Sequence, residues 1–331
     1  MKKAAILLIL ALALLLVIAV SLLLGASPIS LHDLLNALMN PGTITPVTLI
    51  VWKLRVPRIL LGMMVGAGLA TSGCVMQSIL RNPLADPYTL GISGGAALGV
   101  MLAYISGLAS ISFLMVPLCA FAGTLISTVI MYAIASRRSF SPSTLILSGI
   151  ILGFFFSSLV TLISSLADPN KLKQAIVWIL GDLSSTQSSL LIIAAMIVVI
   201  GIGFTALYWR ELDLLALGEE KAFQLGLDTS RATRALFVAS SAIISACVSV
   251  SGVIGFVGLV IPHLARYIIG PRHNTLIIAS ALLGAAFLVA CDTTARTIIS
   301  PIELPVGVIT GIIGGIFVVL FLLKKSTERF F

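Results

Sequence analysis

Long apolar stretches separated by short charged segments dominate the pattern along this chain. Ten stretches of roughly 20 residues hold a single charged side chain, Arg266, which lies near the edge of its stretch. An α-helix needs about 20 apolar residues to cross the hydrocarbon core of a bilayer. The pattern therefore predicts ten membrane-spanning helices. They are expected at 4–24, 59–80, 89–107, 114–136, 143–166, 188–209, 235–250, 252–269, 274–291 and 304–323.

Two of these boundaries depend on turn residues rather than on charge. The run 88–136 contains no charged residue, and we divide it between Gly107 and Pro117. The run 235–262 is also uncharged, and Ser251-Gly252 predicts a tight turn within it. Membrane-spanning strands would alternate polar and apolar residues. Here apolar side chains occupy every side of each stretch, which favours helices.

Composition agrees with this pattern. Of the 331 residues, 59% are hydrophobic and only 10% are charged, and the mean hydropathy is +1.17. A water-soluble domain carries about 25% charged residues. We therefore predict an all-α polytopic membrane protein that forms a single transmembrane domain over residues 1–331.

The distribution of basic residues predicts the orientation in the membrane. Ten crossings place both termini on one side, and basic residues stay on the cytoplasmic side. This topology places fourteen Lys and Arg inside and six outside, so both termini are predicted to be cytoplasmic. The excess of Lys and Arg on the predicted cytoplasmic side also explains the net charge of +8, so nucleic-acid binding is not needed to account for it. The six outside are Lys53, Arg55, Arg58, Lys171, Lys173 and Arg296.

The first apolar stretch has an alternative interpretation. Residues 1–27 begin with basic residues and end in small ones, as a cleaved signal peptide does. A signal peptide has an apolar core of about 7–15 residues, and this one exceeds that length. We therefore expect the segment to remain as a membrane helix.

Four connecting loops are long enough to interpret. The external loop 25–58 ends in basic residues, and the external loop 292–303 holds Asp292, Arg296 and Glu303. In 167–187, Asp168-Pro169 and helically spaced apolar residues (Leu172, Ile176, Ile179) predict a surface helix over about 169–181. The internal loop 210–234 is the richest in charge, and glycines at 218 and 226 enclose a predicted two-turn helix.

The sequence contains few residue patterns that are typical of nucleotide binding, catalysis or metal binding. No phosphate-binding Gly-x-x-x-x-Gly-Lys-Ser/Thr motif occurs, so we expect no ATP site in this chain. His32, His263 and His273 are isolated, and the four cysteines show no metal-ligand spacing, so neither a catalytic residue nor a metal site is predicted. Ion-driven carriers keep charged residues within the membrane. Their scarcity here indicates that a partner on the internal loop supplies the energy.

Several motifs resemble those of the FecCD permeases, the membrane subunits of binding-protein-dependent ABC importers for iron-siderophore complexes, haem and vitamin B12. The resemblance extends from about Trp52 to the C-terminus, in matching order and spacing. The motifs are Arg55–Arg58 (RVPR), the glycine-rich 62–73, Gln77, Arg81–Pro87 (RNPLADP), Leu90–Ala97 (LGISGGAA), Gly255–Arg266 (GFVGLVIPHLAR) and Glu303–Gly311 (ELPVGVITG).

The resemblance implies a type II ABC importer permease fold in a bacterial or archaeal cytoplasmic membrane. It implies a homodimer, two ATPase subunits that bind ATP and Mg on the inside, and a substrate-binding protein outside. By the same resemblance Arg55, Arg58 and Arg296 bind carboxylates of the binding protein. The expected ATPase coupling residues are Leu217, Gly218, Glu219, Glu220, Ala222, Leu225 and Gly226.

The resemblance also implies a cytoplasmic gate at Asn82 and Leu84. Ser141 and Ser143 are assigned to the other gate from their loop position alone. The expected substrate is an iron-siderophore complex, with vitamin B12, haem or molybdate as alternatives within the family. A secondary carrier or channel is the alternative from another class.

Overall fold

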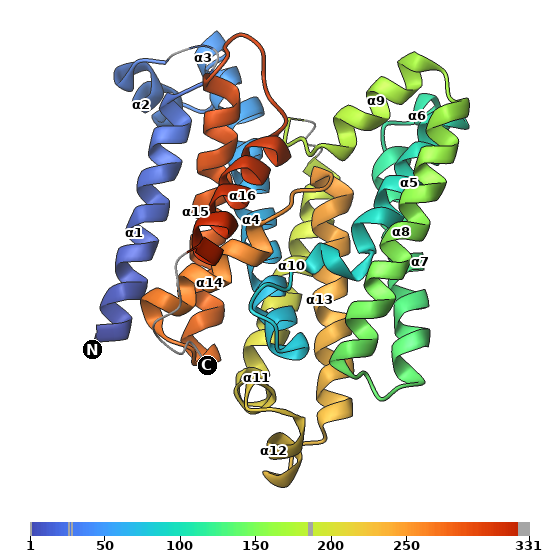
Figure 1. The fold of residues 1–331 in the computed structure, drawn as a ribbon. Helices are drawn as coiled ribbons and strands as arrows, with labels where there is room; N and C mark the ends of the chain where they lie inside the picture. Colours follow the sequence, from blue (N-terminus) through green and yellow to red (C-terminus); the bar gives the residue numbers. More distant parts are fainter. Residues whose placement is uncertain (1, 26, 28, 185–187, 324–331) are drawn as a thin grey trace.

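The computed structural model describes residues 2–25, 27, 29–184 and 188–323, and every regular element within them is a helix. The long helices run side by side between two ends of a bundle (Figure 1). The basic residues Lys324, Lys325 and Arg329, on which the expected cytoplasmic C-terminus partly depends, lie outside the described residues.

Among the described residues, eight helical segments are long and apolar enough to cross a membrane. Each of the ten expected spans corresponds to a helix, but two of these helices are short. The α5 helix has 14 residues and α14 has 13, so each is only about 20 Å long. The ten helices are α1 Lys2–Leu23, α4 Val56–Leu80, α5 Ile92–Ile105, α7 Met115–Ser136, α8 Pro142–Leu166, α10 Ser188–Leu207, α13 Thr229–Ser251, α14 Val257–Ile269, α15 His273–Thr297 and α16 Val306–Leu323.

The two short helices begin at loops that meet inside the bundle. The Asp86 carboxylate accepts hydrogen bonds from Tyr88 N at 2.8 Å and from Phe256 N at 3.3 Å. The Tyr88 hydroxyl accepts a hydrogen bond from Ile254 N at 3.3 Å. Non-helical backbone within a membrane protein must find such partners, because lipid offers none.

Both predicted turns are confirmed. The α13 helix ends at Ser251 and is followed by Gly252, whose φ of +71° is readily adopted only by glycine. The α5 helix ends at Ile105, and Gly107 (φ +80°) begins the turn toward α7. A single-turn helix, α6 Leu108–Ile111, lies in that connection.

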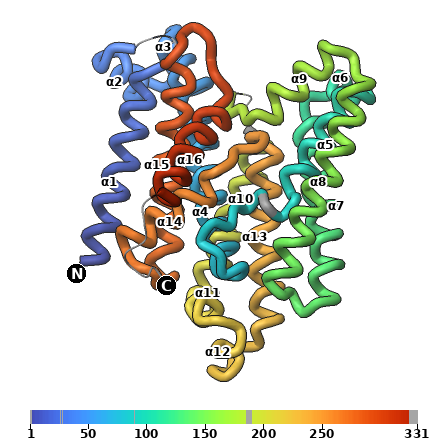
Figure 2. Tube along the Cα trace, viewed as in Figure 1, coloured from blue at the N-terminus to red at the C-terminus, as the bar shows by residue number. Residues whose placement is uncertain are grey.

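Short helices gather at the two ends of the bundle (Figures 1 and 2). The end that holds the start of α1 also holds the α7–α8 turn and two helices of the connection after α10. The opposite end holds α6 and the short helices in the connections 25–58 and 167–187. The short elements at the ends are α2 Leu31–Met39, α3 Pro46–Leu49, the π-helix η1 Ile50–Arg55, α9 Pro169–Ile179, α11 Trp209–Ala216 and α12 Glu219–Gln224. The 3₁₀ helix η2 Pro87–Leu90 lies inside the bundle, where Tyr88 contacts Ile254.

The surface helix predicted over 169–181 is confirmed as α9, although its buried face differs in part from the prediction. The Asp168 side chain caps it, as expected, by accepting from Asn170 N at 2.9 Å. Leu172 and Ile179 pack against α5 and α7, but Ile176 is 45% exposed. Ala175 is buried in its place because a small side chain allows close approach of the helices.

Several of the expected loops contain helices, and the expected external loop 25–58 holds α2, α3, η1 and the first residues of α4. The internal loop 210–234 consists mostly of α11, α12 and the first residues of α13. The expectation of an external loop over 292–303 was wrong at its start, because α15 continues to Thr297. A charged residue normally marks the end of an apolar span. Here Asp292 lies inside the helix, because arginines neutralise it.

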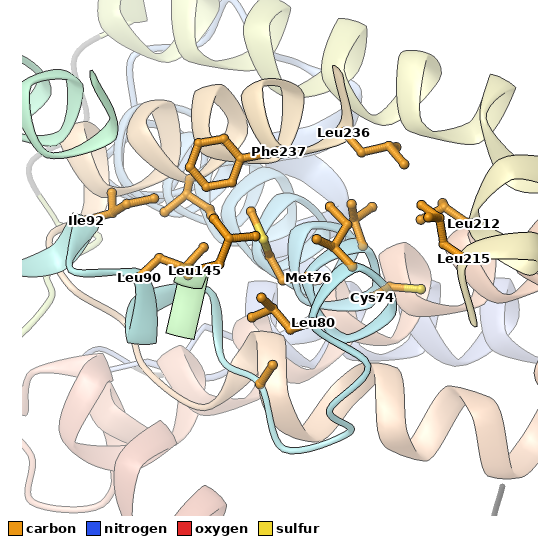
Figure 3. Packing of buried hydrophobic residues seen from close by; sticks show 14 of the residues in the cluster. Cys74, Met76, Leu80, Leu90, Ile92, Leu145, Leu212, Leu215, Leu236 and Phe237 are labelled. Carbon is orange, nitrogen blue, oxygen red and sulfur yellow. The ribbon is translucent and has the colours of Figure 1, made fainter. Parts of the chain in front are cut away.

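The core lies where α4 meets α13, α15 and α8. A Cβ atom added to Gly66 would lie 2.2 Å from the carbonyl oxygen of Gly284, so α4 and α15 touch through their backbones. Around α4, buried apolar side chains include Met76 and Leu80, together with Leu236 and Phe237 of α13 (Figure 3). Leu212 and Leu215 of α11 join this cluster, which fixes α11 to the membrane helices.

Candidate functional site

A cluster of charges lies at the end of the bundle that we expect to face outward. The Arg58 guanidinium of α4 contacts Asp292 of α15 at 2.9 Å and Glu303 at 2.7 Å. Arg296 Nε lies 3.0 Å from the other Asp292 oxygen, at an angle too bent for a good hydrogen bond. Asp292 therefore joins two arginines from different helices.

Burial distinguishes the three arginines expected to dock a binding protein. Arg55 and Arg296 are each only 4% exposed. Arg55 donates to the carbonyl oxygens of Leu22 and Ser27, at the end of α1. Only Arg58, with 11% of its side chain exposed, and Glu303, with 41%, reach the surface.

The sequence predicts these arginines at the same end of the molecule but indicates no role for Asp292. The structure brings all three arginines together. Asp292 contacts Arg58 and Arg296, whereas backbone carbonyl oxygens at the end of α1 bind Arg55. The spacing of Asp292 and Arg296, four residues apart, was a signal that both lie on one helical face. The partner from α4 could not be found in this way, because Arg58 is 234 residues away.

At the opposite end, α12 projects beyond the long helices (Figure 1). The predicted two-turn helix between Gly218 and Gly226 is confirmed, and both glycines have positive φ angles of 108° and 87°. Three apolar side chains of this segment are more than half exposed: Leu217 at 56%, Phe223 at 72% and Leu225 at 61%. Among the other expected coupling residues, Ala222 is buried, while Glu219 and Glu220 are exposed.

Two polar links join this projecting segment to the membrane helices. Glu219 of α12 pairs with Arg81, at the end of α4, at 3.5 Å. Asp213 of α11 accepts hydrogen bonds from His273 N at 2.9 Å and Nδ1 at 2.6 Å. Burial alone would raise the pKa of Asp213, but these hydrogen bonds outweigh it and hold that pKa below its usual value.

The His273 ring also reaches α4, where its Nε2 lies 2.7 Å from Ser78 Oγ. This Ser–His–Asp sequence of contacts resembles that of a hydrolase, but its environment does not suit catalysis. Ser78 and His273 are 5% and 2% exposed, and the Ser78 hydroxyl donates to Cys74 O at 3.0 Å. A nucleophile needs access to substrate and a free lone pair aimed at it. The contacts therefore connect α4, α11 and α15 structurally.

The four expected gate residues lie in two different turns. The Asn82 side chain accepts from Leu84 N at 3.0 Å, which fixes the turn after α4. Ser141 caps α8 by accepting from Thr144 N at 3.3 Å, and Ser143 is exposed in the first turn of that helix. Leu80 and Leu145, close to the two turns, belong to one apolar cluster (Figure 3).

Metal-ligating side chains are scattered. Across the described part of the chain, no three His, Cys, Asp or Glu side chains lie close enough together to hold a metal ion. His263 packs against Phe317 and Phe321, and His32 contacts Asn36 at 3.0 Å. The charged groups with defined geometry at the two ends of the bundle are the arginine cluster and the α11–α12 links.

Comparison with known proteins gives consistent matches over most of the chain. The cobalamin import system permease protein BtuC of Halobacterium salinarum is 42% identical over 85% of this chain and 74% of its own length. The hemin transport system permease protein HmuU of Yersinia pestis is 38% identical over 84% of this chain and 85% of its own.

The fold also matches a solved structure described as a metal-chelate type ABC transporter in an inward-facing conformation. Its TM-score is 0.84 at 29% identity, and the match covers 97% of this chain and 99% of that one. The model of the FecCD transport family matches residues 12–324. This chain therefore belongs to the FecCD transport family.

Proposed function

We propose that this chain is the membrane permease of an ABC importer that carries an iron-siderophore complex across the cytoplasmic membrane. In this proposal two copies form the pathway, two ATPase subunits bind at the α12 end, and a substrate-binding protein docks at the arginine cluster. Support for a metal chelate comes from the description of the solved structure, and cobalamin and hemin are the cargoes named for the two relatives.

The observation that carries the proposal is the geometry of α12. The segment 217–226, in which glycines enclose the six-residue helix α12, extends past the bundle and exposes Leu217, Phe223 and Leu225. Apolar side chains on a projecting, water-facing helix are a typical protein-binding feature. Because the sequence contains no phosphate-binding motif, a separate ATPase is the partner that this helix fits.

The connections of α12 explain how a movement of the ATPase would reach the membrane helices. Glu219 contacts Arg81, which immediately precedes the gate residue Asn82. Asp213 holds His273, at the start of α15, and thereby contacts Ser78 of α4. A displacement of α11 and α12 would therefore shift the end of α4, where the Asn82–Leu84 turn begins. Leu145 packs near this turn, and Ser141 and Ser143 would close the path from α8.

At the outer end, we propose that carboxylates of the binding protein compete with Glu303 for Arg58. The guanidinium can hold two carboxylates at once, and Glu303 is the more exposed of its two partners. Arg55 and Arg296 lie behind Arg58 and are too buried for direct contact in this conformation. Their positive charge would strengthen the attraction for an incoming carboxylate.

The test is reconstitution of the chain into liposomes with its ATPase and binding protein, with uptake of radiolabelled ferric siderophore as the readout. Gly226→Trp is expected to abolish uptake because the α12 segment can no longer fit against the ATPase. Gly107→Trp is the matched control. Gly107 also has a positive φ and free space around it, but it directly precedes α6, at the opposite end of the bundle.

The results separate the alternatives. Wild-type uptake by Gly226→Trp would contradict the coupling role of α12. Uptake of cobalamin, haem or molybdate instead of ferric siderophore would correct the substrate while leaving the importer intact. Uptake by the chain alone, without ATPase or ATP, would indicate a secondary carrier or channel.

A further inference from the structure

A groove on the membrane-facing side of the bundle has a shape and charge that the proposed transport function does not use. It is an open groove with a volume of about 780 Å³ between α7, α10 and α13. Two stripes of residues at helical spacing form its walls, and Tyr132 of α7 closes one side. The stripes are Ile197, Ile200, Gly201 and Phe204 of α10, and Arg231, Arg234, Ala235, Val238, Ala239 and Ala242 of α13.

Most of the groove is apolar, and its width comes from small residues. Ala235, Ala239 and Ala242 leave space along α13, while Gly201 lets Ile243 of α13 pack closely against α10. Larger side chains border the groove on either side: Ile200 of α10 is 70% exposed and Val238 of α13 is 48% exposed. A surface of this kind suits a flexible hydrocarbon chain.

The charged residues are confined to one end of the groove. Arg231 and Arg234 occupy the first turns of α13, on the α12 side of the bundle. Arg231 pairs with Asp228 at 2.9 Å, and Arg234 Nε donates only to the carbonyl oxygen of Ser230 at 3.3 Å. No carboxylate among the described side chains pairs with Arg234, so this end of the groove has a net positive charge.

The length of the groove matches one leaflet of a bilayer. From Arg231 to Ala242 the helix advances eleven residues, or about 16 Å at 1.5 Å per residue. Half of a hydrocarbon core is about 15 Å thick. An acyl chain that starts at the headgroup level would therefore end near the bilayer midplane, where the groove ends.

We propose that this groove binds an anionic phospholipid from the leaflet on the α12 side, with its phosphate on Arg234 and Arg231 and an acyl chain along α10 and α13. A second copy of this chain suits the groove less well. A two-fold axis along the membrane normal would place the arginines of both copies at the same level, where they would repel. That this leaflet is the cytoplasmic one rests on the proposed function. The binding itself does not.

The experiment measures lipid retained by the full-length chain in native mass spectrometry. The detergent-purified protein is titrated with phosphatidylglycerol and with phosphatidylcholine that carry identical acyl chains. We expect phosphatidylglycerol to bind at least tenfold more tightly. The double variant Arg231→Gln with Arg234→Gln should remove this preference, because each arginine is expected to strengthen phosphatidylglycerol binding about fivefold.

Two further variants test the groove itself. Arg137→Gln with Arg138→Gln removes the same charge from the α7–α8 turn, outside the groove, and should leave lipid retention unchanged. Ala242→Trp fills the apolar end and should lower retention of both lipids, while glycerol phosphate without acyl chains should not compete with phosphatidylglycerol.

Four outcomes would overturn the proposal. Equal binding of the two lipids would show that the arginines do not select an anionic headgroup. Equal losses in both arginine pairs would show nonspecific charge attraction. Competition by glycerol phosphate would show a free-anion site, and loss of a protein dimer in Ala242→Trp would show that a second copy covers the groove.

Discussion

Replacement of Asp292 by asparagine is expected to be among the most damaging single changes at the arginine cluster. Asp292→Asn keeps the size of the side chain but removes its charge. Asp292 is 2% exposed and contacts Arg58 at 2.9 Å and Arg296 at 3.0 Å. The variant leaves Arg296 buried without a carboxylate partner, whereas Arg58 retains Glu303.

The magnitude follows from burial. Removing one partner of a buried ion pair costs about 3–5 kcal/mol, because the remaining charge is left uncompensated. Glu303→Gln breaks an ion pair with the same Arg58, but Glu303 has 41% of its side chain exposed. Such a pair is worth about 0–1 kcal/mol. We therefore expect Asp292→Asn to destabilise the protein several-fold more than Glu303→Gln.

The assay is unfolding of the detergent-purified chain in a mixed-micelle denaturant titration, with far-UV circular dichroism as the readout. A double variant, Asp292→Asn with Arg296→Met, should recover part of the loss because it also removes the unpaired cation. Equal effects of Asp292→Asn and Glu303→Gln, both below about 1 kcal/mol, would refute the reasoning. Water or lipid headgroups would then be compensating the arginines.

Three further predictions concern packing, the inner end and energy supply. Gly284→Val should destabilise the protein by more than the usual 1–3 kcal/mol of overpacking, because its Cβ would lie 2.3 Å from the Gly66 carbonyl oxygen. Gly315→Val is the control: its Cβ would meet open space, so this variant should be nearly neutral in the same unfolding assay. Asp213 has a folded-state pKa below its unfolded value of about 3.9, so the stability that its ionised carboxylate contributes is present above pH about 4 and is lost as the pH falls through that lowered pKa. Asp213→Asn should therefore lower stability at pH 7 and flatten its decline in acid, and an unchanged acid profile would contradict the link to His273. The purified chain alone should hydrolyse no ATP in a phosphate-release assay, and turnover free of any ATPase subunit would exclude the permease interpretation.

Local patterns decided most of the helices. The apolar stretches, the turn at Gly252 and the surface helix after Asp168 depend on residues close together in the sequence, so hydropathy and turn chemistry could locate them. The α12 helix was predictable for the same reason, because Gly218 and Gly226 enclose it.

Pairing between distant residues was decided only by the tertiary structure. Hydropathy placed Asp292 outside the membrane helix because an isolated charge is costly there, yet Arg58 of another helix compensates it within α15. Contacts between residues that are distant in the sequence also explain the burial of Arg55 and the link from Asp213 to His273. They explain the shortness of α5 and α14 as well. A single sequence records which groups are charged or polar, but their energetic cost depends on neighbours that only the folded chain brings within about 3 Å.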